Sequence, residues 1–280
     1  MIYVKRDPNK IPEKLLEMAE RAQKELEGLP HAERVAFIKK KSRIWRAFKK
    51  CLAGMSNDKC WYSEMKPVQA FFDVDHFRPK SEAERSDGVT DDGYPWLAFS
   101  WDNFRYSAPR SNQLSKDEET DQTKGKSSWF PLAKDSPVAC WEDRCIDKEM
   151  PILLDPINGK DMKLIRVGAG GLIESSRICK GLDKKRVDAT VDCYGLNLPR
   201  LRDARLEVMR QVSEMIDTLI DDADVGDKVA DDDVVKLNLL RKSNTVTERA
   251  LPKSEYSLAA RAVLSAKFPE LLPDLADYAA

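Results

Sequence analysis

FFDVDHFRPK, at residues 71–80, joins a run of β-forming residues to a polar segment that can carry chemistry. Its first residues, Phe71–Val74, predict a short strand. Asp75 and His76 follow directly, and Pro79 predicts a bend in the backbone behind them. Because successive residues of a strand point to opposite faces, such a bend is what allows Asp75 and His76 to enter one site. Taken alone, the pair is also consistent with a structural, hydrogen-bonded histidine.

The region that follows replaces helical periodicity with glycine, proline, aspartate and aromatic residues. A second strand is predicted at Trp96–Ser100. It is separated from the first by SEAERSDGVTDDG, residues 81–93, which has the composition of an exposed loop. YPWLAFSWDNFRYSAPRSNQ, residues 94–113, then supplies two side-chain amides, Asn103 and Asn112.

Helices flank this region on both sides. Apolar residues at helical spacing predict helices at residues 12–27, 32–53, from 199 onward, 234–240 and 257–266. A hairpin is predicted from strands at residues 163–167 and 172–174, and an acidic loop at residues 221–233. The expected fold class is α+β, divided into residues 1–56, 57–135, 136–198 and 199–280.

The second predicted helix carries an unusually basic face. No acidic residue occurs between positions 34 and 50, whereas Lys39, Lys40, Lys41 and Arg43 all lie there. A cluster of this kind predicts contacts with the phosphates of a nucleic acid. A solvated helix face is an equally good explanation of the pattern.

The composition limits the class of protein. Of 280 residues, 42% are hydrophobic and 34% are charged, which excludes a disordered or fibrous chain. Six cysteines are too few for a disulfide scaffold. No apolar segment is long enough to span a bilayer and no secretory leader is evident, so we expect a cytoplasmic protein that does not enter the membrane.

The spaced motifs DVDHFRPK, WDNFRYSAPRSN and KGKSSWFPL together resemble the HNH endonucleases. More narrowly, the chain resembles the HNH subunit of Septu-type and retron-associated anti-phage systems. That similarity includes LLDP at Leu153–Pro156, the hairpin, and YGLNLPRLRDAR at Tyr194–Arg205. The resemblance spans roughly residues 57–210 and implies a ββα-metal core within residues 57–135.

The resemblance implies a metal-dependent endonuclease that hydrolyses phosphodiester bonds of DNA, as the effector of a defence complex with an ABC- or SMC-like ATPase. Asp75 and Asn112 offer oxygen ligands to a single Mg²⁺ or Mn²⁺. His76 is the expected general base, and Asn103 orients its imidazole or braces the connecting loop. We expect Asp75, His76 and Asn112 to converge on one site, and activity to fall as pH drops through about 6.5.

Further basic residues are candidate phosphate contacts, each equally consistent with a solvated surface charge. They are Arg78, Lys80, Arg105, Arg110 and Lys126.

Many HNH proteins clamp this core with a structural zinc held by two Cys-x-x-Cys knuckles. Here the corresponding positions are Cys60 with Ser63 and Ala108 with Ser111, so only one of the four is a cysteine. We therefore expect no structural zinc, and expect aromatic packing to hold the core instead. The aromatic residues concerned are Trp61, Tyr62, Trp96, Phe99, Trp101 and Phe104. Cys140 and Cys145 are expected to be free thiols.

Two other functions remain open at this point. The missing knuckles favour a catalytically silent, nucleic-acid-binding adaptor with an HNH fold. A nuclease that cleaves RNA, such as tRNA, is also consistent with the motifs, because nothing in them reads the sugar. The acidic C-terminal helices either dock the partner ATPase or simply complete the core.

Overall fold

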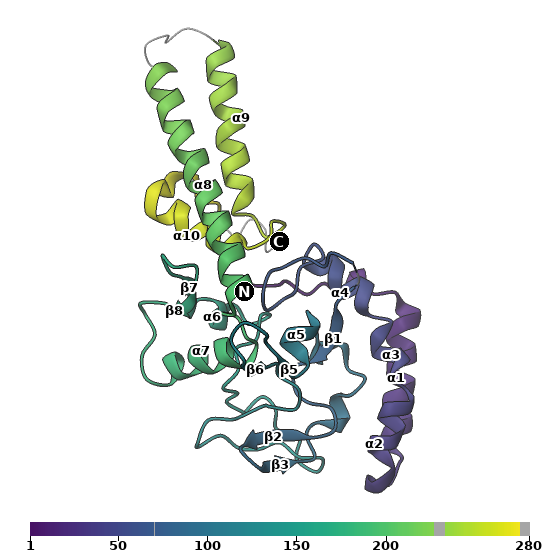
Figure 1. Ribbon diagram of the computed structural model, residues 1–280. Coiled ribbons are helices and arrows are strands. Elements are labelled where there is room, and N and C mark those ends of the chain that lie inside the picture. Colours follow the sequence, from purple (N-terminus) through teal and green to yellow (C-terminus); the bar gives the residue numbers. More distant parts are fainter. Residues whose placement is uncertain (70, 227–232, 275–280) are drawn as a thin grey trace.

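The computed structural model describes residues 1–69, 71–226 and 233–274, and combines many helices with small antiparallel sheets (Figure 1). The α+β class expected from the sequence is confirmed. The helices are α1 (Glu13–Glu27), α2 (His31–Lys40), α3 (Arg43–Arg46), α4 (Lys49–Met55), α5 (Pro109–Asn112), α6 (Gly159–Met162), α7 (Leu182–Cys193), α8 (Pro199–Gly226), α9 (Asp233–Arg249) and α10 (Ser257–Lys267).

The strands of the described residues form four two-stranded sheets. They are β1 (Asp73–His76) with β4 (Phe104–Ser107), β2 (Ala83–Ser86) with β3 (Val89–Asp91), β5 (Ser115–Lys116) with β6 (Thr123–Lys124), and β7 (Ile165–Val167) with β8 (Ile173–Ser175). Short 3-10 turns occupy Pro8–Lys10, Pro95–Leu97, Trp101–Asn103 and Pro269–Leu271.

The first predicted strand exists but begins two residues later than expected, at Asp73. The backbone N–H of Phe72 donates to the hydroxyl of Tyr106 at 3.1 Å, so at this residue a side chain replaces the partner strand. From Asp73 the ladder is regular, and Asp75 stands opposite Arg105 in β4. The strand therefore includes the Asp-His pair and does not end before it.

The second predicted strand, at Trp96–Ser100, is wrong. Pro95 lacks a backbone N–H, and the N–H of Leu97 donates to the carbonyl of Tyr94 in a tight turn. Trp96 and Phe99 are both buried by this turn, a pattern that alternation along a strand would not produce. The partner of β1 is instead β4, which begins directly after Asn103.

The predicted exposed loop at residues 81–93 is also wrong, because it contains the hairpin β2–β3. Gly88 forms its turn with a φ of +72°, a conformation that glycine adopts without strain. Ala83, the first residue of β2, is fully buried. Glu84 exchanges backbone hydrogen bonds with Ser128 and Phe130, which ties the hairpin to the segment that carries Lys126.

The helix predicted over Ala32–Ala53 is three helices, α2, α3 and α4. A straight helix would place Lys41 on the buried face between Ile38 and Trp45. The chain turns there instead, and Nζ of Lys41 reaches Oε2 of Glu25 at 2.9 Å. The breaks allow the apolar residues to remain buried while the lysine stays near solvent.

The C-terminal region matches its predicted helices and extends them. α8 and α9 run side by side as a projecting pair, and α10 packs against the base of α8 (Figure 1). The predicted acidic loop is partly wrong, since residues 221–226 continue α8, while residues 227–232 lie outside the described residues. The predicted hairpin is confirmed as β7–β8. Within the part of the chain described, no helix combines the length and apolar character needed to cross a membrane.

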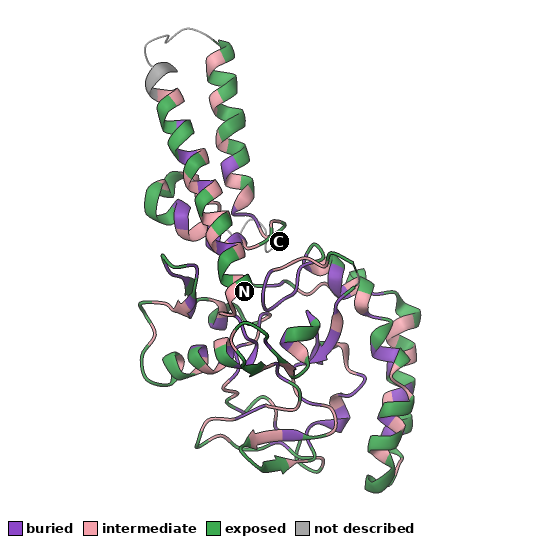
Figure 2. Cartoon of the chain, viewed as in Figure 1, coloured by how far each residue is buried: buried purple, intermediate pink, exposed green. Residues whose placement is uncertain are grey.

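Two hydrophobic clusters hold the described residues together. The larger contains Leu26 of α1, Phe104 of β4 and Val187 of α7, so the N-terminal helices, the β1–β4 sheet and the hairpin region share one core. The smaller joins Ile216 of α8 and Val246 of α9 to the buried face of α10. The distal part of the α8–α9 pair is largely exposed (Figure 2).

Candidate functional site

Asp75, His76, Lys80 and Asn112 line one cavity of about 420 Å³. Asp75 and His76 come from the end of β1, and Asn112 comes from the last residue of α5, the helical turn after β4. Pro109 begins that turn in its first position, where its missing N–H costs nothing. The structure thus brings together the three residues that the sequence expected to converge.

The carboxylate of Asp75 is buried and both of its oxygens are engaged. The hydroxyl of Tyr62 donates to Oδ2 at 2.6 Å. Nζ of Lys126 donates to Oδ1 at 3.0 Å and to the carbonyl of His76 at 2.7 Å. Since the side chains of Asp75 and Lys126 are 2% and 1% exposed, the two charges compensate each other inside the protein.

The imidazole of His76 is held edge-on between Trp45 of α3 and Phe104 of β4. Nε2 lies 2.9 Å from the carbonyl oxygen of Ala98, which can only accept, so Nε2 carries the hydrogen and donates it. Nδ1 of the neutral ring therefore keeps its lone pair. It accepts no hydrogen bond from the described residues, and His76 lines the cavity at Asp75.

Burial lowers the pKa of His76 well below its ordinary value, and the nearby charge of Lys80 lowers it further. Lys80 is itself partly buried, with Nζ 5.2 Å from the ring centre of Trp45. The ring is therefore neutral at pH 7. It also stays unprotonated in mildly acidic solution, where it can still act as a base. The fall in activity expected near pH 6.5 moves to a lower pH.

Replacing Lys80 by methionine removes a positive charge near the imidazole but keeps the aliphatic stem on Trp45. Because a positive neighbour disfavours the protonated ring, we expect Lys80→Met to raise the pKa of His76 towards 6.5. The chain has two histidines, so NMR titration of the two imidazole signals measures this directly. His31, exposed and paired with Asp92, is the internal control and should not move. An unchanged His76 titration would contradict this electrostatic account.

Asn103 braces the backbone behind the site, and both of its side-chain hydrogen bonds go to Arg78 and not to the imidazole. Its Oδ1 accepts from the N–H of Arg78 at 2.8 Å, and its Nδ2 donates to the carbonyl of the same residue at 2.8 Å. The N–H of Phe77 also donates to the carbonyl of Asn103. Of the two roles left open by the sequence, these contacts match the bracing of the connecting loop.

Most of the candidate phosphate contacts are committed to pairs within the protein. Arg105 is buried and donates to both oxygens of Asp155, at 2.7 and 2.6 Å. Arg78 donates to Glu149 at 3.0 Å and to a backbone carbonyl. These two arginines and Lys126 thus serve the fold. Lys80 remains at the cavity.

The basic residues outside the cavity remain more accessible. Lys39, Lys40 and Arg43 are exposed on α2 and α3, whereas Lys41 pairs with Glu25. Arg110 is exposed and lies 3.2 Å from the carboxylate of Asp117.

Two residues of the site were not singled out from the sequence. Tyr62 was grouped with the aromatic packing residues, and its distance from Asp75 along the chain gave no sign that its hydroxyl supports the carboxylate. Glu82 is exposed at the cavity and adds a second carboxylate to its lining. The signal for Glu82 is its place in RPKSE, directly behind the bend at Pro79.

The donor set at this cavity suits a weakly held, oxygen-ligated ion. In residues 1–69, 71–226 and 233–274, no group of three or more His, Cys, Asp or Glu side chains stands ready to enclose a metal. Asp75 and Asn112 supply oxygen atoms of the kind that Mg²⁺ prefers, and an open cavity leaves room for water and phosphate. These residues fit a divalent ion that keeps several non-protein ligands.

The knuckle positions do meet in the fold, with hydrogen bonds around the one cysteine. Sγ of Cys60 accepts from the N–H of Ser63 at 3.4 Å and from the N–H of Ala108 at 3.2 Å. All four positions, including Ser111, are buried. The thiol of Cys60 thus accepts from the backbone N–H groups of Ser63 and Ala108. A zinc cage would instead need further side-chain ligands around it.

We expect the purified protein to contain no zinc, because one thiol among these four side chains cannot form a tetrahedral cage. Elemental analysis of the protein after dialysis measures this. One equivalent of zinc per chain would show that Cys60 recruits ligands not identified here.

Comparison with known proteins gives one informative match. No family model matches the chain. It is 27% identical over 197 residues to the Septu protein PtuB of Bacillus mycoides (strain KBAB4). The chain is thus similar to a Septu protein. The match covers 68% of this chain and spans 60% of the length of that protein.

Proposed function

We propose that the chain is a metal-dependent endonuclease of the HNH type that hydrolyses phosphodiester bonds of DNA. One observation carries this proposal: a neutral His76, whose Nδ1 accepts no hydrogen bond from the described residues, lines the same cavity as Asp75 and Asn112. A general base next to oxygen ligands for a cation is what hydrolysis of a phosphodiester requires. The order β1, β4, α5 is compatible with a ββα core.

In this mechanism Nδ1 of His76 takes the proton from the attacking water, while Ala98 holds the ring in the required tautomer. Lys80 places a positive charge at the cavity that attracts the phosphate. When bound by Asp75 and Asn112, Mg²⁺ or Mn²⁺ supplies a Lewis acid for the scissile phosphate. Tyr62 and Lys126 orient the carboxylate of Asp75 from behind.

The similarity to a Septu protein supports a role in anti-phage defence. We propose that the nuclease acts there with an ABC- or SMC-like ATPase. The projecting α8–α9 pair offers a surface for such a partner, since Val234, Leu237 and Leu240 of α9 are exposed apolar residues.

The decisive experiment is cleavage of supercoiled plasmid by the purified chain in Mg²⁺, Mn²⁺ or EDTA, with and without the product of a neighbouring ATPase gene. We expect nicked or linear DNA only with a divalent ion. A parallel assay with tRNA distinguishes an RNA substrate. Absence of cleavage of either polymer under all these conditions would overturn the proposal.

One observation favours the silent adaptor as a second candidate. Both oxygens of Asp75 are already engaged, one of them by Nζ of Lys126, although a metal would need this carboxylate. An adaptor binds nucleic acid without cutting it in any of these conditions, so the same assay together with a binding measurement separates the two functions.

The exposed basic residues of α2 give a prediction for binding. Reversing the charge of Lys39 and Lys40 should weaken DNA binding and reduce the slope of log affinity against log salt by about 2, because two phosphate contacts are lost. The single-turnover rate of bound DNA should be nearly unchanged, since neither residue lines the cavity. Reversing Lys160, an exposed lysine on α6, is the control. An unchanged salt slope would assign Lys39 and Lys40 to an ordinary solvated face.

A further inference from the structure

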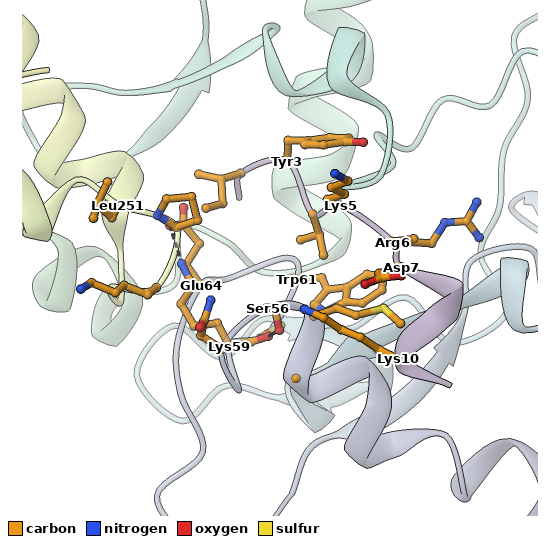
Figure 3. A pocket seen from close by; sticks show the side chains of 18 of the residues that line it. Tyr3, Lys5, Arg6, Asp7, Lys10, Ser56, Lys59, Trp61, Glu64 and Leu251 are labelled. Atoms are coloured by element: carbon orange, nitrogen blue, oxygen red, sulfur yellow. Dashed lines mark hydrogen bonds and ion pairs between the residues drawn. The ribbon is translucent and has the colours of Figure 1, made fainter. Parts of the chain in front are cut away.

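A second cavity, of about 660 Å³, lies where three distant segments of the chain meet (Figure 3). Its walls are residues 2–10, residues 54–64 around the end of α4, and Leu251–Lys253 between α9 and α10. It shares no lining residue with the Asp75 cavity. Its volume falls in the usual range for small-molecule sites, and is larger than a phosphate or a metal ion needs.

Of the two acidic residues that line this cavity, one is compensated by positive charge within the protein. Oδ1 of Asp7 accepts from the N–H of Asn9 at 2.9 Å. Glu64 is buried, where Oε2 accepts from Ser257 at 2.8 Å and lies 3.7 Å from Nζ of Lys59. Glu64 is therefore compensated within the protein, whereas Asp7 keeps a negative charge at the cavity.

The basic groups are less completely paired. Arg6 pairs with Asp102, and Lys253 pairs with Glu248. Lys5 and Lys10 are exposed, and neither has an ion-pair partner among the residues that the structure describes. Because two unpaired lysines outnumber the one unpaired carboxylate, that of Asp7, among the described residues of its lining, the charge left over at this cavity is positive and favours an anionic ligand.

The cavity is also polarised between charged and apolar walls. Figure 3 shows Lys5, Trp61 and Lys10 towards one end of the cavity and Leu251 at the other. Met55 and Pro252 add further apolar lining. An inorganic anion would leave these apolar walls unused, whereas a fatty acid would leave the polar lining unmatched.

The amides of Asn9 and Asn57 line the same cavity and are exposed. Each offers both a donor and an acceptor, which is what the edge of a nucleobase pairs with. We propose that this cavity binds a nucleoside phosphate, with its phosphates at Lys5 and Lys10 and its base against the apolar lining at Leu251 and Pro252. This is a site additional to, and independent of, the proposed nuclease centre.

Isothermal titration of the full chain with ATP and with ADP in EDTA tests the proposal, with adenosine and tripolyphosphate as partial ligands. We expect saturable binding of ATP or ADP, and at least tenfold weaker binding of each partial ligand. Equal affinity for tripolyphosphate and ATP would overturn the nucleoside assignment. No saturation by either nucleotide at millimolar concentration would overturn the site itself.

Variants of Gly54 test whether ATP binds in this cavity. Gly54 is an exposed residue of α4 in the cavity wall, and a Cβ added there meets nothing within 4 Å. Gly54→Phe should therefore fold, since most residues favour a helix more than glycine does, and should obstruct the cavity. We expect it to weaken ATP binding at least tenfold, while Gly54→Ala leaves binding unchanged. Equal binding by the wild type and Gly54→Phe would contradict the placement.

Charge reversal gives an independent check. The double variant Lys5→Glu, Lys10→Glu should weaken ATP binding at least about tenfold, because two attractive charges become repulsive. Lys14→Glu, an exposed change just outside the lining, is the matched control. Lys80→Met should not affect ATP binding. Loss of binding in Lys80→Met, with retention in Gly54→Phe, would place the nucleotide at the Asp75 cavity and overturn the proposal.

Discussion

His76→Ala should reduce the rate of phosphodiester cleavage by about 10² to 10⁴, the usual contribution of a positioned general base. The reason is that His76 supplies the one imidazole among the described residues that line the cavity at Asp75. Single-turnover cleavage of plasmid DNA measures the effect. DNA binding should survive, because the exposed basic residues of α2 are untouched.

Folding is the necessary control, since the ring packs between Trp45 and Phe104. His76→Asn keeps more of the side-chain volume and should lose the same activity with a smaller change in thermal stability. His31→Ala removes the other histidine, which is exposed, and should cut at the wild-type rate. A folded His76→Ala protein with wild-type activity would exclude the general-base mechanism and leave the adaptor function.

Lys126→Met should lower the free energy of unfolding by about 3–5 kcal/mol, because it leaves the carboxylate of Asp75 buried without its compensating charge. Urea denaturation followed by circular dichroism measures this. The double variant Asp75→Asn, Lys126→Met should recover most of the loss, since an amide is far less costly to bury than an ion.

The neighbouring Lys124 provides the matched control. It pairs with the exposed Asp192, so Lys124→Met should cost about 1 kcal/mol or less. Equal free energies of unfolding for Lys126→Met and Lys124→Met, within error, would show that the buried pair is not what holds Asp75 in place.

The sequence predicted those features that depend on local pattern. The Pro12-to-Gly28 segment became α1, and the Gly-rich turn between two apolar runs became β7–β8. The strand β4 begins directly after Asn103, although the β-forming run at Trp96–Ser100 suggested an earlier strand. At Trp96–Ser100 the turn that begins at Pro95 outweighed the preference of these residues for a strand.

What could not be predicted depends on long-range pairing. Arg105 and Lys126 have the sequence context of surface phosphate contacts, yet each is buried and pairs with a carboxylate far away in the chain. Nothing near Arg105 in sequence indicates Asp155. The helix break near Lys41 has a similar cause, because its partner Glu25 lies on another helix. Charge alone does not distinguish a surface contact from a buried pair.

The arginines of the central region also bear on how the chain can be shortened. Arg78 and Arg105 lie within residues 57–135, but their carboxylate partners, Glu149 and Asp155, lie beyond it. A fragment cut at residue 135 keeps every catalytic side chain proposed here and loses both counter-ions. We therefore expect that the smallest fragment able to fold with this centre intact extends past residue 135 and includes Glu149 and Asp155.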